Sequence, residues 1–148
     1  MKGRTAGFTL IEILVVIVIM AMSASLVLAW VRGIRRSEFK QRVRALAEGL
    51  RLSVYRSLVS GEPVSITVHP DCSKVEFSWK NVKWNVKLPK GTRCYAERDD
   101  ELAEVEERMV FTISGVPSFP KLIVKLGSWN YTIDPKKLTL WEEYETSS

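Results

Sequence analysis

The sequence predicts an α+β protein in which a long N-terminal helix, with a transmembrane half and an amphipathic half, packs on a small antiparallel β-sheet domain. The first observation is a run of apolar residues from Phe8 to Val31, followed by apolar residues at helical spacing as far as Leu58. The second is a change after Gly61 to short segments of alternating apolar and polar residues, separated by turns that contain Gly or Pro. With 148 residues, the chain has room for one small domain beyond the helix.

The apolar run over residues 8–31 predicts a membrane-spanning helix. It contains 24 residues, and about 20 apolar residues suffice to cross roughly 30 Å of hydrocarbon as a helix. Glu12 is its single charged residue, and a carboxylate at the centre of such a helix costs about 2.5 to 3.5 kcal/mol on insertion scales. We therefore expect Glu12 to have a partner and a function. A plain signal anchor and a secretory signal peptide are the alternatives, but the apolar core of a signal peptide has only about 7 to 15 residues.

Residues 32–60 are expected to continue the helix as an amphipathic stalk. Apolar residues recur there every three or four positions, which places them on one face of a helix. This stripe consists of Phe39, Val43, Leu46, Leu50, Val54 and Leu58. Gly49 interrupts the stalk and is expected to weaken the helix locally. The helix is expected to end at Ser60-Gly61-Glu62-Pro63.

The remaining residues, 61–148, are expected to form a β-rich globular domain. Strands are predicted over Val64–His69, Val75–Trp79, Val82–Leu88, Thr92–Ala96, Met109–Ser114, Lys121–Leu126, Trp129–Ile133 and Lys137–Trp141. Between them, the acidic segment Glu97–Arg108 is expected to be a solvated loop with a helical turn. Its functional alternative is an acidic docking face for a basic neighbour.

Positive charge is concentrated in the stalk. The whole chain has a net charge of +5, from 22 Lys and Arg against 17 Asp and Glu. The basic residues nearest the span are Arg32, Arg35, Arg36, Lys40, Arg42 and Arg44. Because they follow the span directly, we expect them to contact anionic lipid headgroups or acidic neighbours. Contact with nucleic acid phosphates is the alternative.

No pattern of catalytic or metal-binding residues is visible, so we expect neither an enzyme nor a metal or cofactor site. His69 is the only histidine, and no phosphate-binding loop, nucleophile elbow or zinc-protease motif occurs. The two cysteines, Cys72 and Cys94, could form one disulfide in an extracytoplasmic compartment. Two free thiols are the alternative.

The first twelve residues carry a family resemblance. Gly7-Phe8-Thr9-Leu10-Ile11-Glu12 follows a short polar leader with Lys2 and Arg4, and resembles the processing site of type IV pilins and type II secretion pseudopilins. The resemblance implies that a prepilin peptidase removes residues 1–7 by cleavage after Gly7 and methylates the new amine of Phe8. It also implies that Glu12 pairs with the amine of a neighbouring subunit during filament assembly.

Later segments resemble the GspH/FimT-type minor pseudopilins and minor pilins. These segments are Tyr55–Val64, Val110–Gly115, Ile123–Leu126 and Tyr131–Ile133. The resemblance implies a pilin-like fold and a structural role as a minor pseudopilin of a type II secretion system. The implied partners are other pseudopilins or pilins in the filament or its tip, the prepilin peptidase and the assembly platform.

The resemblance further implies a single-pass protein of the inner membrane, with the C-terminal domain in the periplasm. The positive-inside rule predicts the orientation of the span less clearly, because Lys2 and Arg4 precede the span and Arg32, Arg35 and Arg36 follow it. The alternative role is that of a minor type IV pilin that takes part in pilus assembly or in DNA binding during natural transformation. The acidic tail Trp141–Glu145 argues against nucleic acid as a partner, since it would repel phosphate.

Overall fold

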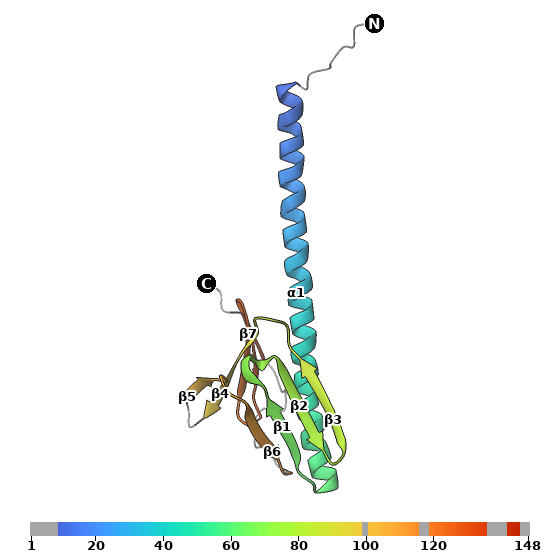
Figure 1. Ribbon diagram of the computed structural model, residues 1–148, viewed down its shortest axis with the longest axis vertical. Helices are drawn as coiled ribbons and strands as arrows, with labels where there is room; N and C mark the ends of the chain where they lie inside the picture. The colour runs from blue at the N-terminus through green and yellow to red at the C-terminus, as the bar shows by residue number, and fades with distance from the viewer. Residues whose placement is uncertain (1–8, 99–100, 116–118, 136–141, 146–148) are drawn as a thin grey trace. The chain divides into compact units, whose positions relative to one another are not determined.

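The computed structural model describes residues 9–98, 101–115, 119–135 and 142–145. It contains one long helix followed by a short 3₁₀ turn and nine strands in two antiparallel sheets, which confirms the predicted α+β class. The chain divides into two compact units, residues 1–37 and 38–148. The helix, α1 (Leu10–Ser60), contributes residues to both. Within the second unit, both sheets lie beside the last six turns of α1 (Figure 1).

The buried face of α1 is built around positions that alternate in steps of four and three residues. These positions are Phe39, Val43, Leu46, Leu50, Ser53 and Ser57, and Ala47 and Gly49 beside them are also buried. The prediction was correct for the first four positions of the apolar stripe and wrong for the last one, because Leu58 is 61% exposed. A step of four residues turns an α-helix by about 40° more than a full turn, so repeated steps of four leave the face. Alternating steps of four and three stay on it, and at the end of α1 these positions hold serines.

Ser57 anchors the end of α1 to the end of strand β6 (Met109–Ile113). Its hydroxyl donates a hydrogen bond to the main-chain carbonyl of Ile113 at 3.1 Å and accepts one from the N–H of Gly115 at 2.6 Å. Ser53 is satisfied within the helix, where its hydroxyl donates to the carbonyl of Gly49 at 2.8 Å. Both buried hydroxyls therefore have partners, as burial of a polar group requires.

Gly49 has a packing role that its sequence position did not reveal. A Cβ atom at this position would lie 2.8 Å from Cζ of Phe77, closer than real Cβ contacts allow. Phe77 is fully buried and stacks on Trp84 with ring centroids 5.2 Å apart. The missing side chain thus lets an aromatic ring lie directly against the backbone of α1, which offsets the lower helix propensity of glycine.

The first sheet has the strand order β3-β2-β1-β6 and is antiparallel throughout. Its strands are β1 (Val64–Val68), β2 (Lys74–Trp79), β3 (Val82–Lys87) and β6. Alternate residues of β1 and β2 are buried, as period-two patterning predicts for a sheet with one covered face. Lys80 and Asn81 form the predicted two-residue turn, with Trp79 opposite Val82. Lys80 adopts a left-handed φ of 50° there.

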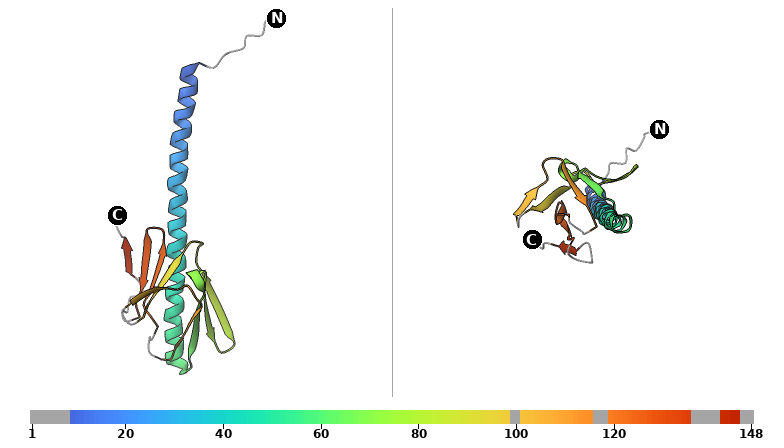
Figure 2. Two further views of the ribbon diagram at one scale, coloured as in Figure 1. Left: turned by 60° about the vertical axis from the view of Figure 1, so that its left-hand side comes forward. Right: turned by 90° about the horizontal axis from the view of Figure 1, so that it is seen from below.

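The second sheet has the order β5-β4-β7-β8-β9. Its strands are β4 (Arg93–Arg98), β5 (Glu101–Glu104), β7 (Leu122–Leu126), β8 (Trp129–Ile133) and β9 (Glu142–Glu145). The strand expected over 137–141 lies outside the described residues. Figure 2 shows this sheet as a layer separate from β1, β2 and β3.

The acidic segment corrects one prediction, because it pairs as a β-hairpin instead of forming a solvated loop with a helical turn. Strand β5 lies antiparallel to β4, with Ala103 opposite Ala96 and Leu102 opposite Glu97. Strand β4 is already held on its other side by β7, so it offers β5 a fixed row of backbone partners. The N–H of Val105 extends this pairing by donating to the carbonyl of Cys94 at 2.9 Å. Glu101, Glu104, Glu106 and Glu107 are exposed, and the charge pattern alone could not distinguish such a strand from a loop.

The core of the second unit lies where the inner faces of both sheets meet α1. Phe39 of α1 contacts Tyr131 of β8 edge to face, with ring centroids 5.4 Å apart. The largest fully buried side chains are Tyr131, Phe39, Phe77, Leu46, Leu50, Ile66, Ile113, Leu122, Ile133, Val43, Val64 and Val68. All of these side chains are at position 39 or later in the sequence, so the described core lies within the second unit.

Candidate functional site

Glu12 lies in the first turn of α1, three residues after Thr9, which directly precedes the helix. The main-chain carbonyl of Thr9 accepts hydrogen bonds from the N–H groups of Glu12 and Ile13, at 3.0 and 3.3 Å. The Thr9 N–H in turn donates to Oε2 of Glu12 at 3.4 Å. A Glu three residues after a Thr commonly caps a helix in this way. Glu12 therefore stabilises the start of α1, where the helix dipole also favours negative charge.

The helix surface around and after Glu12 is apolar on all sides. Its large apolar side chains are exposed, from Leu10, at 84%, to Ile34, at 46%. The most apolar window of 18 residues has a mean hydropathy of 2.7, and none of it is buried within the chain. By length and composition, α1 can therefore cross a membrane.

The two serines of this apolar segment have their hydroxyls satisfied inside the helix. Ser23 Oγ donates to the carbonyl of Ile19, and Ser25 Oγ donates to that of Met22, both at 2.7 Å. Such bonds leave no hydroxyl that needs water. Glu12 is then the only ionisable side chain between Leu10 and Val31, which makes its position chemically distinct.

The six basic residues predicted to contact anions follow this segment on α1. Arg32, Arg35 and Arg36 belong to the first unit, and Lys40, Arg42 and Arg44 belong to the second. All are exposed except Lys40, which is half-buried.

The N-terminal segment is the part of the chain that matches a known family. Residues 2–28 match the prokaryotic N-terminal methylation motif. The chain has a type IV pilin-like N-terminus. The motif supports processing by prepilin peptidase, anchoring in a membrane through the apolar helix, and assembly with other pilin-like proteins. No curated protein and no solved structure matches the chain significantly.

Of the predicted processing and assembly residues, the structure describes only Glu12. Gly7 and Phe8 lie outside the described residues. The capping contact with Thr9 was missed by sequence reasoning, although Thr9-Leu10-Ile11-Glu12 has the Thr-x-x-Glu spacing of a capping box. The same residues were interpreted as the start of the membrane segment, so the capping spacing was not considered.

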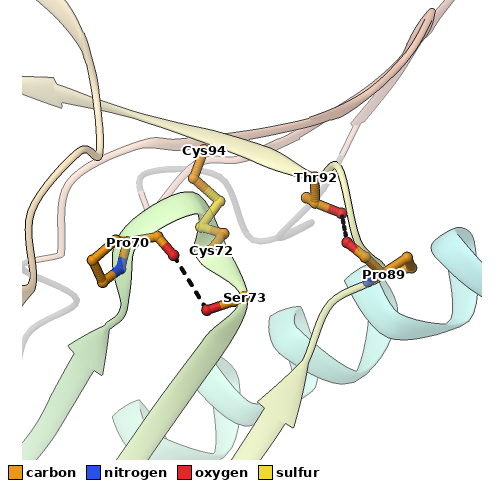
Figure 3. Close-up of a disulfide and its surroundings, with 6 residues drawn as sticks. All are labelled: Pro70, Cys72, Ser73, Pro89, Thr92 and Cys94. Atoms are coloured by element: carbon orange, nitrogen blue, oxygen red, sulfur yellow. Dashed lines mark hydrogen bonds between the residues drawn. A yellow bond between two sulfur atoms is a disulfide. The ribbon is translucent and has the colours of Figure 1, made fainter.

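Cys72 and Cys94 are joined by a disulfide that connects the two sheets (Figure 3). Cys72 ends the 3₁₀ turn η1 (Pro70–Cys72) between β1 and β2, and Cys94 lies near the start of β4. Their Cα atoms are 5.6 Å apart, and both residues are almost completely buried. Short local hydrogen bonds flank the bridge, from Ser73 Oγ to the Pro70 carbonyl and from Thr92 Oγ1 to the Pro89 carbonyl, at 3.2 and 2.7 Å.

His69 takes part in a surface ion cluster at the end of β1. Its Nε2 lies 3.2 Å from Oε2 of Glu76, and Oε1 of the same carboxylate accepts a hydrogen bond from Nζ of Lys74. The hydrogen bonds from Lys74 and then from His69 lower the pKa of Glu76 from 4.5 to about 2. Among the described residues, no group of three or more His, Cys, Asp or Glu side chains could hold a metal ion.

Proposed function

We propose that the chain is a minor pseudopilin of a type II secretion system, a structural subunit that prepilin peptidase cuts after Gly7 and methylates at the amine of Phe8. The observation that carries this proposal is the methylation motif over residues 2–28, which includes the first part of an exposed apolar helix. The GspH/FimT-type resemblance of the later strands favours a minor subunit. The mature helix would remain in the inner membrane, with the β-rich domain in the periplasm, until the subunit enters the filament or its tip.

Glu12 would set the register of the subunit in the filament. After cleavage, Phe8 would carry a positively charged amine. Glu12 is the single carboxylate in the apolar segment that could pair with such an amine. In surroundings of low dielectric, attraction between opposite charges is strong, and an unpaired charge is costly. A neighbour at the correct axial position would therefore be strongly preferred over one that leaves the carboxylate unpaired.

Variants of Glu12 can separate the register role from the capping role. A Gln at this position can still accept the hydrogen bond from Thr9, as Glu and Gln both do in capping boxes, but it carries no charge. We expect Glu12→Gln and Glu12→Ala both to be cleaved after Gly7 and both to be lost from the assembled filament. Mass spectrometry of the N-terminus and the amount of protein in sheared filaments measure the two steps. Normal assembly of Glu12→Gln would show that capping suffices and would contradict the register role.

The choice of secretion machine is tested by cross-linking the tagged chain in the membrane of its own cell. Recovery of other pseudopilins and of a secretion-type assembly platform is expected. Recovery of a major type IV pilin and competence proteins instead would move the assignment to a minor pilin. Arg32, Arg35, Arg36, Lys40, Arg42 and Arg44 would then be tested for DNA binding over a series of salt concentrations, since phosphate contacts weaken steeply with salt.

A further inference from the structure

Two exposed surfaces of the second unit carry opposite charge. The first, here called the acidic hairpin, contains Glu101 of β5 and the two carboxylates just after this strand, Glu106 and Glu107. The second, here called the basic edge, contains Lys83 and Lys87 of β3 and Lys90 of the turn that follows. All six side chains are exposed.

The charges of these surfaces have no counter-ion within the described residues, whereas neighbouring charges do. Glu97 pairs with Lys121 at 3.1 Å, Glu62 with Lys80 at 3.0 Å, and Glu76 with both Lys74 and His69. Glu104 makes a long contact of 3.9 Å with Arg93. Several neighbouring charges are thus paired locally, whereas three carboxylates stay exposed on one surface and three ammonium groups on the other. Arg108 is also exposed, directly after Glu107.

The two surfaces cannot satisfy each other within one chain. The β4–β5 hairpin and the β2–β3 hairpin lie on opposite sides of the second unit in all three views of Figures 1 and 2. Strand β3 is the outer strand of the first sheet, and β5 is the outer strand of the second, so both surfaces face outward. A cavity of about 600 Å³ opens beside the basic edge, and its charged lining residues are Lys87, Lys90, Arg93 and Asp71.

We propose that the acidic hairpin of one copy of this chain contacts the basic edge of a second copy. The contact is heterologous, because it joins two different surfaces, and such contacts close into rings or repeat into open helical arrays, depending on the rotation between the copies. This inference rests on the proposed role as a filament subunit, and it names the second copy as the neighbour. Electrostatic complementarity of this kind chiefly sets orientation and association rate, and it is screened beyond about 8 Å at physiological ionic strength.

Lysines on an outer strand also discourage unwanted strand pairing, which would explain the basic edge without any partner. The test must therefore show that the acidic hairpin and the basic edge act together. A photo-cross-linking amino acid at Asn85, an exposed residue of β3, reports the contact between two differently tagged full-length copies in the membrane. The variant Glu101→Lys/Glu106→Lys/Glu107→Lys makes both surfaces basic. The variant Lys83→Glu/Lys87→Glu/Lys90→Glu makes both surfaces acidic.

Each reversed variant on its own should lose at least ten-fold in cross-linked dimer, because both of its surfaces carry the same sign. The two variants expressed together should recover most of the wild-type yield, since a basic surface again meets an acidic one. Arg108→Glu, which adds a negative charge beside the acidic hairpin, is the matched control and should keep or raise the yield. Failure of the mixture to recover, or an undiminished yield in either variant alone, would overturn the proposal.

The same samples separate this inference from the proposed function. The N-terminal residue, identified by mass spectrometry, reports cleavage after Gly7, and intact Cys72–Cys94 bridging on a non-reducing gel reports folding of each variant. Cleaved, folded and filament-associated protein without the cross-link would overturn the contact alone. Cross-linked protein without cleavage would overturn the filament-subunit role while leaving the contact established.

Discussion

At the scale of single residues, Thr9 and Glu12 show how one side chain can serve two environments. In the isolated chain, the carboxylate of Glu12 accepts a hydrogen bond from the N–H that begins α1. In the proposed filament, the same carboxylate would be needed by the amine of a neighbour. The 3.4 Å length of the capping bond indicates a weak contact that a charged partner can replace.

Glu76 provides a pH-dependent prediction at this scale. Its folded-state pKa of about 2 lies below the ordinary value of 4.5, so its stabilising contribution is present above pH 4.5 and is lost as the pH falls toward 2. Because Lys74 is the largest cause, Lys74→Ala should raise the pKa of Glu76 more than His69→Ala does. Titration of the Glu76 side chain by NMR measures both shifts, and a larger effect of His69→Ala would contradict the assignment.

At the scale of elements, the contribution of each leucine in the second half of α1 to stability depends on the face of the helix that it occupies. Leu50 is completely buried and Leu58 is 61% exposed, although both belong to the apolar stripe of the sequence. Leu50→Ala should lower the free energy of unfolding by about 2 to 5 kcal/mol through lost burial and a residual cavity. Leu58→Ala, the matched control on the same helix, should change it by less than about 0.5 kcal/mol. Urea unfolding of the full chain in detergent measures both, and equal losses would show that the assignment of the buried face is wrong.

Most elements could be predicted from the sequence, because their patterns are local. The helix was expected from Phe8 to Leu58 and is described from Leu10 to Ser60, and seven predicted strands agree within two residues at each end. The face of α1 at Ser53 and Ser57 was missed, since hydrophobicity cannot mark a buried position that holds a hydrogen-bonded serine. Strand β5 was missed because its pairing depends on β4 being fixed by β7, which is a tertiary effect.

The candidate site was predictable to a different extent. Gly7, Phe8 and Glu12 could be proposed from a short contiguous motif, since the processing enzyme reads the chain locally. By contrast, the separation of the acidic hairpin from the basic edge depends on where β3 and β5 lie in their sheets. Net charge could not reveal this separation, because a sum along the chain hides charges that are segregated in space.

At the scale of the whole molecule, the disulfide is the covalent link between the two sheets. Closing a loop of 22 residues stabilises a fold by about 3 kcal/mol in the chain-entropy model. Cys72→Ala/Cys94→Ala should therefore lower the free energy of unfolding by about that amount. Urea unfolding in detergent measures this loss, and the wild-type protein under reducing conditions serves as the control and should lose a similar amount. An unchanged stability in both cases would contradict a stabilising role for the bridge.

The position of the described core, entirely at Phe39 and beyond, makes the chain modular. The methylation motif and the apolar span precede the first residue that the β-rich domain needs for its packing. The N-terminal segment, residues 1–37, can therefore be exchanged for that of another subunit, or removed near Ser37, without exposing the hydrophobic core of the second unit. Such a chain would be a soluble, single-unit version of the protein, and natural recombination at the same junction could deliver this domain to a different machine.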